Sequence, residues 1–207
     1  VLQEYFGHSE FREGQSELIN HIMSGRDVLG IMPTGAGKSL CYQVPALMLD
    51  GITIVVSPLI SLMKDQVNAL VQSEIRAGYL NSSLTGSEYY TVLRKACSGE
   101  YKLLYVAPER LVTDDFIKFA TESQISMVTI DEAHCVSQWG QDFRPSYLKI
   151  VEFIQHLSNR PIISAFTATA TKEVRDDIIQ ILQLDNPFVI TTGFDRKNLS
   201  FSVQKPK

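Results

Sequence analysis

The chain has 207 residues, of which 44% are hydrophobic and 20% charged, and its formal net charge is −4 at neutral pH. The apolar content suffices for the core of one globular domain, and no apolar run approaches the roughly 20 residues needed to span a bilayer. A domain that held nucleic acid by charge alone would usually be basic, so the composition argues against an autonomous, tight DNA-binding module.

The cysteines and the start of the chain bear on its compartment. Cys41, Cys97 and Cys135 are odd in number and far apart, which argues against a disulfide framework and against a zinc site in this segment. The chain begins at Val1 without a signal peptide. We therefore expect a segment of a soluble intracellular protein, either cytoplasmic or associated with the nucleoid or nucleus.

Short β-branched runs alternate with amphipathic stretches along the chain, and this alternation predicts the fold class. Strands are expected at 27–32, 52–57, 78–81, 102–106, 127–130, 161–166 and 187–191. Helices are expected between them, for example at 38–49, 59–72, 89–96, 147–157 and 172–182. Near-continuous apolar strands separated by helices are typical of an α/β, doubly wound, mostly parallel sheet with helices on both faces. We expect one domain over residues 1–193 and a linker over 194–207.

A phosphate-binding loop is predicted directly after the first strand. The segment Pro33-Thr-Gly-Ala-Gly-Lys-Ser39 joins that strand to a helix, with Met32 where the general pattern has glycine. Gly35 and Gly37 let the backbone wrap closely around a phosphate, and the helix N-terminus adds positive potential. Lys38 would neutralise phosphate charge and the Ser39 hydroxyl would hold Mg²⁺. The nucleotide-binding residues predicted here are Thr34, Gly35, Ala36, Gly37, Lys38, Ser39 and Leu40.

An acidic pair follows the strand at 127–130. Asp131 and Glu132 open the string Asp-Glu-Ala-His134 at the carboxyl end of that strand. Asp131 is predicted to hold Mg²⁺ beside Ser39, and Glu132 to orient or deprotonate an attacking water. Such a pair alone would usually be a solvated turn, but the upstream phosphate loop makes the functional interpretation strong. Lys38, Asp131 and Glu132 are therefore the predicted catalytic residues.

These two motifs and the segments around them resemble the first RecA-like domain of a RecQ-family helicase of superfamily 2, over nearly the whole chain. Phe6-Gly-His-Ser-Glu-Phe-Arg-Glu-Gly-Gln15 resembles the adenine-recognition motif of that family. The resemblance implies that Gln15 reads the adenine edge while His8 and Arg12 pack on the base. His8 departs from the tyrosine that the family commonly has at this place.

The resemblance also implies a DNA-contacting and coupling surface. Ser57-Pro-Leu-Ile-Ser-Leu-Met-Lys-Asp-Gln-Val67 and Ala107-Pro-Glu-Arg-Leu111 resemble DNA-contact motifs, and Thr167-Ala-Thr-Ala170 resembles the third helicase motif. The aromatic-rich stretch from His134 to Tyr147 places rings where they can stack on single-stranded bases, although Trp139 and Phe143 could also complete a core. Gln141 departs from the family's usual histidine. The residues assigned to DNA binding or coupling are Ser57, Lys64, Gln66, Arg110, His134, Trp139, Phe143, Arg144, Thr167 and Thr169.

By resemblance, the parent protein is expected to be an ATP-dependent 3′–5′ DNA helicase acting in recombination and repair, with ATP and Mg²⁺ as cofactors. Its expected partners are single-stranded and duplex DNA and a second RecA-like domain of the same chain, with no membrane contact. We expect a monomer, and little helicase or DNA-stimulated ATPase activity from residues 1–207 alone. Two alternatives remain open: a DEAD- or DEAH-type RNA helicase, and a nucleotide-dependent scaffold without motor activity.

Overall fold

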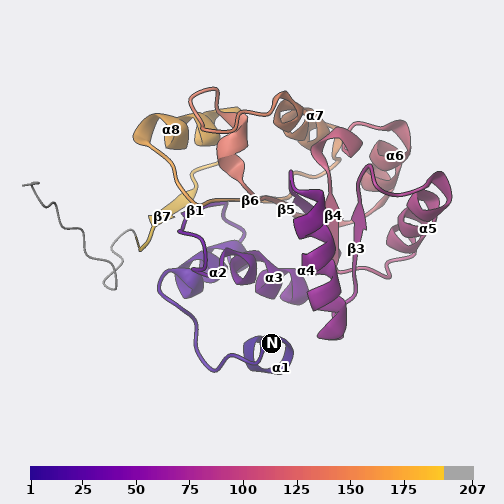
Figure 1. Cartoon of the computed structure of the whole chain (residues 1–207), viewed down its shortest axis with the longest axis horizontal. Coiled ribbons are helices and arrows are strands. Elements are labelled where there is room, and N and C mark those ends of the chain that lie inside the picture. Colours follow the sequence, from indigo (N-terminus) through magenta and orange to yellow (C-terminus); the bar gives the residue numbers. More distant parts are fainter. Residues whose placement is uncertain (194–207) are drawn as a thin grey trace, which may run out of the picture.

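The fold is described from a computed structural model, which describes residues 1–193. The predicted linker at 194–207 lies outside the described residues. A single seven-stranded sheet runs through the domain in the order β3-β4-β2-β5-β6-β1-β7, and every strand pair is parallel (Figure 1). The strands are β1 Val28–Ile31, β2 Ile52–Val56, β3 Ala77–Leu80, β4 Leu103–Val106, β5 Ile125–Ile130, β6 Ile162–Thr167 and β7 Phe188–Thr191. All seven predicted strands are present, and the α/β fold class is confirmed.

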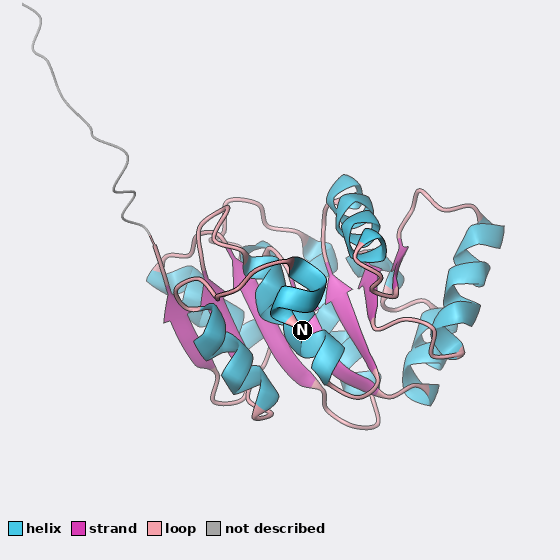
Figure 2. Cartoon of the chain, turned by 90° about the horizontal axis from the view of Figure 1, so that it is seen from below, coloured by secondary structure: helices cyan, strands magenta, loops and turns pink. Residues whose placement is uncertain are grey.

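Helices cover both faces of the sheet. In Figure 1 one layer lies below the strands and another lies above them. The lower layer contains α2 Gln15–Met23, α3 Lys38–Met48 and α4 Ile60–Gln72, and the short α1 Leu2–Phe6 lies over it, as Figure 2 shows from below. The upper layer contains α5 Gly86–Cys97, α6 Asp114–Glu122, α7 Lys149–His156 and α8 Lys172–Ile181. Helices α1, α2 and α6 were not among the helices predicted from the sequence.

Alternating side chains of the strands pack into two separate apolar cores, one between the sheet and each helical layer. Leu29 of β1 packs into the upper core, whereas its neighbour Val28 packs into the lower one. This follows from the two-residue period of a strand, which sends successive side chains to opposite faces. Because strands β1, β2 and β4 are buried along their whole length, they read as continuous apolar runs in the sequence.

Local capping explains several helix boundaries. At α5 the Thr85 side chain accepts a hydrogen bond from the Glu88 amide, and the Glu88 carboxylate accepts one from the Thr85 amide. This reciprocal pair satisfies two otherwise unpaired amides at the helix start.

The predicted helix at 147–157 is divided, since a 3-10 turn at Pro145–Leu148 (η3) precedes α7. Among residues 1–193, no helix combines the length and apolar character that crossing a bilayer requires.

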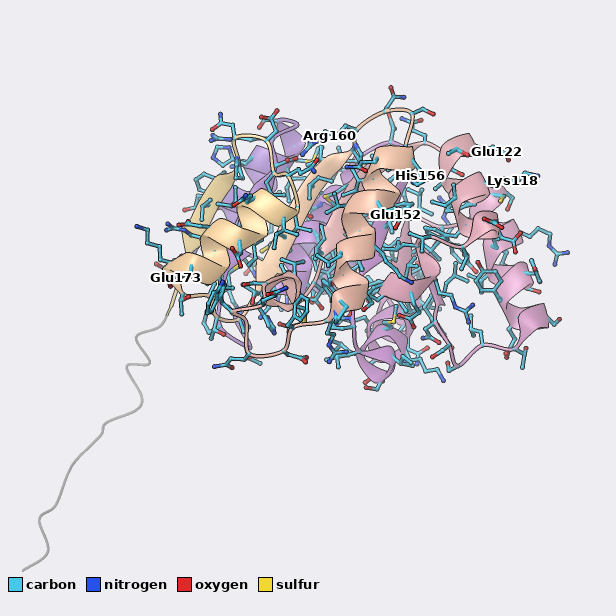
Figure 3. All side chains as sticks on the ribbon, turned by 90° about the horizontal axis from the view of Figure 1, so that it is seen from above. Lys118, Glu122, Glu152, His156, Arg160 and Glu173 are labelled. Atoms are coloured by element: carbon cyan, nitrogen blue, oxygen red, sulfur yellow. The ribbon has the colours of Figure 1, made fainter. Side chains whose placement is uncertain are left out.

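One buried carboxylate connects several segments at the amino-terminal ends of the strands, which we call the amino edge of the sheet. Asp27 precedes β1, is only 2% exposed, and receives two hydrogen bonds from the Arg160 guanidinium. The backbone amides of Ile163 and Asp185 also donate to it, each at 2.8 Å. Figure 3 shows Arg160 near the His156 end of α7, away from Glu173 at the start of α8. Asp27 therefore joins the starts of β1 and β6 and the segment before β7 in one fully paired cluster.

Candidate functional site

The predicted motifs come together at the carboxyl-terminal ends of the strands, which we call the carboxyl edge of the sheet. Strand β6 lies between β1 and β5, so the loops that follow these three strands are neighbours. The Met32 amide, at the start of the phosphate loop, donates to the Thr167 carbonyl at 3.0 Å. The Asp131 amide donates to the Val56 carbonyl of β2 at 2.9 Å. Ligands of open α/β sheets bind at this edge, which makes it the candidate site.

The loop between β1 and α3 has the backbone conformation of a phosphate cradle. Gly35 and Gly37 have φ values of 85° and 81°, in the left-handed region that glycine adopts without steric cost. Gly37 is the N-cap of α3, which begins at Lys38. Thr34 and Gly35 are exposed, and Ala36 through Leu40 are half-buried. The Lys38 ammonium donates to the Met32 carbonyl at 3.1 Å, so the side chain arches back across the loop.

The segment before α2 clamps this loop. The Gln15 amide nitrogen donates to the carbonyls of Ala36 and Gly37, at 3.2 and 3.0 Å, and its oxygen accepts from the Arg12 amide at 2.8 Å. The Arg12 guanidinium donates to the Gly35 carbonyl. Gln15 and Arg12 therefore hold the tip of the loop. Their contact with adenine stays a prediction, as does that of His8, which is exposed.

Asp131 and Glu132 differ sharply in their electrostatics. Burial, reinforced by the neighbouring Glu132 carboxylate, raises the pKa of Asp131 to about 6. A hydrogen bond with His134 lowers the pKa of Glu132. The Lys38 ammonium lowers the pKa of both carboxyl groups, so its charge lies within electrostatic range of the pair. Glu132 also has a left-handed backbone, with φ of 49°, which is uncommon for a residue with a side chain.

His134 connects the acidic pair to the loop after β6. Its Nδ1 lies 2.8 Å from the Thr167 hydroxyl and 3.3 Å from the Glu132 carboxylate. Because the Thr167 hydroxyl donates to the Thr169 carbonyl at 3.1 Å, it accepts from a protonated Nδ1. Hydrogen bonds with Cys135 and Glu132 raise the pKa of His134 to about 10. The chain Glu132–His134–Thr167 therefore spans two loops at the carboxyl edge.

The donor set fits a hard divalent cation. The Ser39 hydroxyl is half-buried at the start of α3, and the Asp131 carboxylate accepts from the Glu132 amide at 3.0 Å. Among residues 1–193, Asp131 has no cationic side chain within salt-bridge distance, although burial penalises its charge. Oxygen ligands and an uncompensated carboxylate are what Mg²⁺ prefers. Ser39 and Asp131 therefore suit the metal role predicted from the sequence.

The aromatic-rich loop presents one ring and buries another. Trp139 is 78% exposed, so it does not complete the core, and Phe143 is half-buried. Tyr147 is fully buried, and its hydroxyl donates to the Asp131 carbonyl at 2.9 Å. Tyr147 is consequently unable to stack on a base and instead braces the acidic strand end. Arg144 pairs with the Asp142 carboxylate at 2.7 Å and also reaches a carbonyl of the loop after β2.

The remaining predicted contact residues have mixed surroundings. Lys64 is exposed on α4 and Thr169 is exposed after β6. The Ser57 hydroxyl is buried without a hydrogen-bond partner in the described chain, at the end of β2. Arg110 lies over the ring of Tyr89, 5.3 Å from its centroid. Gln66 is half-buried, and its side-chain carbonyl accepts from the Gln43 amide at 2.9 Å.

Sequence reasoning missed several residues that surround the site. The Tyr42 and Tyr105 hydroxyl oxygens are 3.4 Å apart, and Ser137 donates to Asp177 of α8 at 2.6 Å. None of these residues belongs to a sequence motif that indicates ligand binding. The one available signal was a pair of polar side chains, Tyr42 and Gln43, on the predicted buried face of a helix.

Residues 12–177 match the family described as DEAD/DEAH box helicase. The chain is 50% identical over 206 residues to the ATP-dependent DNA helicase RecQ of Bacillus subtilis, covering 99% of this chain and 35% of that protein. It is 46% identical over 211 residues to the ATP-dependent helicase wrn-1 of Caenorhabditis elegans, covering 100% of this chain and 20% of that protein. The chain thus spans about a third or less of these relatives.

Solved structures support the fold. The helicase Lhr of Mycobacterium smegmatis, solved with single-stranded DNA and AMP-PNP, has a TM-score of 0.74 at 19% identity, covering 92% of this chain and 27% of that one. A hypothetical ATP-dependent RNA helicase from Sulfolobus tokodaii has a TM-score of 0.68 at 22% identity, covering 89% of this chain and 54% of that one. At these identities the likeness concerns the fold alone, and it matches the RecA-like sheet expected from the sequence.

Proposed function

The chain belongs to the DEAD/DEAH box helicase family, and on that premise we propose that it is the nucleotide-binding motor domain of an ATP-dependent DNA helicase. The observation that carries this proposal is the convergence of three loops at the carboxyl edge. The Lys38 ammonium lowers the pKa of Asp131 and of Glu132, and His134 bridges that pair to Thr167. The identity to RecQ enzymes supports DNA rather than RNA as the nucleic acid.

In the proposed reaction the loop residues hold the triphosphate of ATP. The backbone amides from Thr34 to Leu40 and the Lys38 ammonium bind phosphate oxygens. Bound Mg²⁺, held by Ser39 and Asp131, would neutralise charge on the phosphates. Glu132 orients the attacking water and accepts its proton, a role for which its lowered pKa keeps it ionised at neutral pH.

Adenine recognition is proposed for the clamp before α2. Arg12 and His8 are exposed, and Arg12 is hydrogen-bonded to the Gly35 carbonyl of the loop, so both side chains are free to pack against a base. Gln15 already holds the Ala36 and Gly37 carbonyls, so in the proposed complex it would position the loop as well as read the adenine edge. This double use would make loop closure depend on the base.

DNA is proposed to lie across the loops that follow β2, β4, β5 and β6. Trp139 provides an exposed ring for base stacking, worth about 1–3 kcal/mol per base, and Lys64 an exposed charge for phosphate. Arg144 joins the aromatic-rich loop to the loop after β2. The wider set of proposed DNA-binding or coupling residues is Ser57, Lys64, Gln66, Arg110, His134, Trp139, Phe143, Arg144, Thr167 and Thr169.

A second RecA-like domain of the same chain is proposed to complete the motor. It would supply arginine side chains that stabilise charge on the γ-phosphate. Cycles of closure against that domain would move single-stranded DNA in the 3′–5′ direction, in recombination and repair. Residues 1–207 alone are expected to bind nucleotide weakly and to turn it over slowly.

Three measurements test the proposal. In the longer protein that carries this chain, Glu132→Gln should lower DNA-stimulated ATP turnover by at least about a hundredfold while keeping nucleotide binding. Lys38→Ala should abolish binding of a fluorescent ATP analogue. Wild-type turnover should respond to oligo(dT) more than to oligo(U). A stronger response to RNA would favour the RNA helicase alternative, and full turnover by Glu132→Gln would contradict the assigned chemistry.

A further inference from the structure

A buried network of polar side chains joins α3, α4 and β4. We call Tyr42, Gln43, Gln66 and Tyr105 the tyrosine–glutamine network. Tyr42, Gln43 and Tyr105 are 2%, 5% and 1% exposed. Figure 1 shows α3 and α4 side by side in the lower layer, and the network connects these two helices with β4 of the sheet.

The four side chains form one continuous hydrogen-bonded path. The Tyr42 and Tyr105 hydroxyl oxygens are 3.4 Å apart. The Gln43 amide nitrogen donates to the Tyr105 hydroxyl at 3.1 Å and to the Gln66 carbonyl at 2.9 Å. Both amide hydrogens of Gln43 are therefore engaged. The path runs from α3 to β4, back to α3, and across to α4.

One end of the path lies at the proposed nucleotide site. Tyr42 is three residues after Ser39, so the two side chains lie on the same side of α3. Burial, together with Tyr105 and the Asp131 carboxylate, raises the pKa of the Tyr42 hydroxyl well above its ordinary value, whereas a hydrogen bond with Ser39 lowers it. Tyr42 therefore lies one helical turn from Ser39 on α3, and the charge of Asp131 acts on its hydroxyl.

The other end lies on the helix that the proposed DNA surface uses. Gln66 is on α4, two residues after the exposed Lys64, and α4 begins directly after the loop of Ser57 and Leu59. The carbonyl of Pro58 in that loop accepts from Arg144 of the aromatic-rich loop at 3.3 Å. A shift of α4 relative to α3 would accordingly move the proposed phosphate contact and the attachment of the aromatic-rich loop.

The network is costly if packing alone is its purpose. Tyr42 and Tyr105 belong to the lower apolar core, with Met63, Val67 and Phe166 around them. Buried polar groups stabilise little over well-packed apolar groups of the same volume, but they fix relative positions because a broken member leaves its partners unpaired. A network of this kind defines the distance between α3 and α4.

We propose that Gln43 and Tyr105 are positioning residues that transmit nucleotide occupancy at Ser39 to α4, and so make DNA affinity depend on nucleotide. The proposal rests on the proposed function. It adds a second route, besides His134 and Thr167, by which nucleotide binding and DNA binding are coupled. Neither residue touches nucleotide or DNA in it. Their effect passes through Tyr42 on one side and Gln66 on the other.

The test uses the longer protein that carries this chain. Binding of fluorescent oligo(dT) is measured by anisotropy with Mg²⁺ alone and with Mg²⁺ and AMP-PNP, and the ratio of the two dissociation constants reports coupling. Typical coupling between two sites is 5- to 150-fold. Tyr105→Phe removes one hydroxyl. Gln43→Met removes both hydrogen bonds that the Gln43 side-chain amide donates, at similar side-chain volume. Each should move the ratio at least about threefold toward one, with ATP turnover in the absence of DNA changed less than twofold.

A matched control separates coupling from general damage. Tyr101 lies just before β4, is half-buried, and has no hydrogen bond from its hydroxyl among the described residues, so Tyr101→Phe should leave the ratio unchanged. The Gln43→Met and Tyr105→Phe double variant should match the stronger single variant, because the two residues act as one unit. If Tyr105→Phe does not fold, Gln43→Met carries the same comparison.

The outcomes are distinct. An unchanged ratio in folded variants overturns the network's role, and so does an equal loss of coupling, of DNA-free turnover and of melting temperature. If the wild-type protein shows no dependence of DNA affinity on nucleotide, the proposed function itself fails. Coupling that is lost in Tyr105→Phe but kept in Tyr101→Phe supports the inference.

Discussion

Two buried aspartates lie at opposite edges of the same sheet, and their surroundings are opposite in kind. Asp27, at the amino edge, is paired with the Arg160 guanidinium and accepts from two backbone amides. Asp131, at the carboxyl edge, accepts from one neighbouring amide and has the Glu132 carboxylate beside it. The first charge is compensated by the chain itself, whereas the second is compensated only in part.

The difference shows how one fold separates stability from chemistry. A carboxylate that is fully paired holds segments together but has no capacity left for a ligand. A carboxylate that is buried and under-compensated destabilises the domain, and a divalent cation can restore the balance. In this sheet the fully paired carboxylate, Asp27, lies where strands begin, and the under-compensated carboxylate, Asp131, lies where strands end.

The largest expected effect tests the amino edge. Asp27→Ala should lower the free energy of unfolding by about 3–5 kcal/mol, because it leaves the guanidinium and two buried amides without their acceptor. Chemical denaturation of residues 1–207 measures this directly. Arg160→Met should cost less, since the Arg160 side chain is 43% exposed and water can replace some of its contacts. A loss below about 1 kcal/mol in Asp27→Ala would contradict the assigned role.

The second prediction concerns Asp131 and pH. Because burial raises its folded-state pKa to about 6 from 3.8, the associated stability is fully present below pH 3.8 and is lost as the pH rises through 6. Asp131→Asn should therefore be more stable than the wild type by about 2–3 kcal/mol at pH 7.5 without ligand. The gap should close as the pH falls toward 4, as followed by denaturation at each pH.

Glu132→Gln is the matched control for that prediction. The hydrogen bond with His134 lowers the pKa of Glu132, so its contribution is present above pH 4.5 and is lost as the pH falls through the lowered value. Its removal should destabilise the domain at pH 7.5, with the sign opposite to that of Asp131→Asn. Equal signs for the two variants would break the comparison between compensated and uncompensated carboxylates.

The third prediction is a smaller effect of ligand. At ten times the dissociation constant, Mg²⁺ and ATP together should stabilise residues 1–207 by about 1.4 kcal/mol, seen as a rise in melting temperature. Chelation of Mg²⁺ or the Lys38→Ala change should remove most of that rise. Arg160→Met, at the far edge, should keep it. A rise that survives in Lys38→Ala would place the bound nucleotide elsewhere.

The smallest expected effect compares two glycines of the phosphate loop. Both have positive φ, but a Cβ on Gly37 would lie 2.4 Å from the Gln15 amide, whereas one on Gly35 would meet nothing within 4 Å. Gly35→Ala should cost about 1 kcal/mol from backbone strain alone, and Gly37→Ala should cost about 1 kcal/mol more. Denaturation of both variants checks the difference, and equal losses would show that Gln15 does not restrain the loop.

The fold and the motifs were accessible from the sequence because both depend on local patterns. The strand at 27–32 and the loop up to Ser39 combine a buried run, a glycine turn and a helix start within a dozen residues. The topology rule then predicted that the Asp131 strand would end at the same edge. The resemblance to RecQ helicases is confirmed by the comparisons, while the roles of individual site residues stay predictions.

Features that depend on distant pairs were not predictable in this way. Tyr147 looked like a stacking ring, but the structure buries it against the Asp131 carbonyl. Gln66 looked like a surface contact, but it faces Gln43. In both cases the decisive partner lies on another element, at a separation that no periodic pattern encodes. The Asp27–Arg160 pair, 133 residues apart in the chain, was missed for the same reason.

The place of β1 in the sheet has a consequence for biosynthesis. Its hydrogen-bonded neighbours are β6 and β7, so Val28 pairs with Ser164 and with Phe188. On the ribosome, the strand that bears the phosphate loop has no partner until some 130 further residues have emerged, and long-range parallel pairing is slow. We therefore expect the central strands to assemble first, with β1 joining β6 and β7 joining β1 afterwards, so that nucleotide competence would come late in folding.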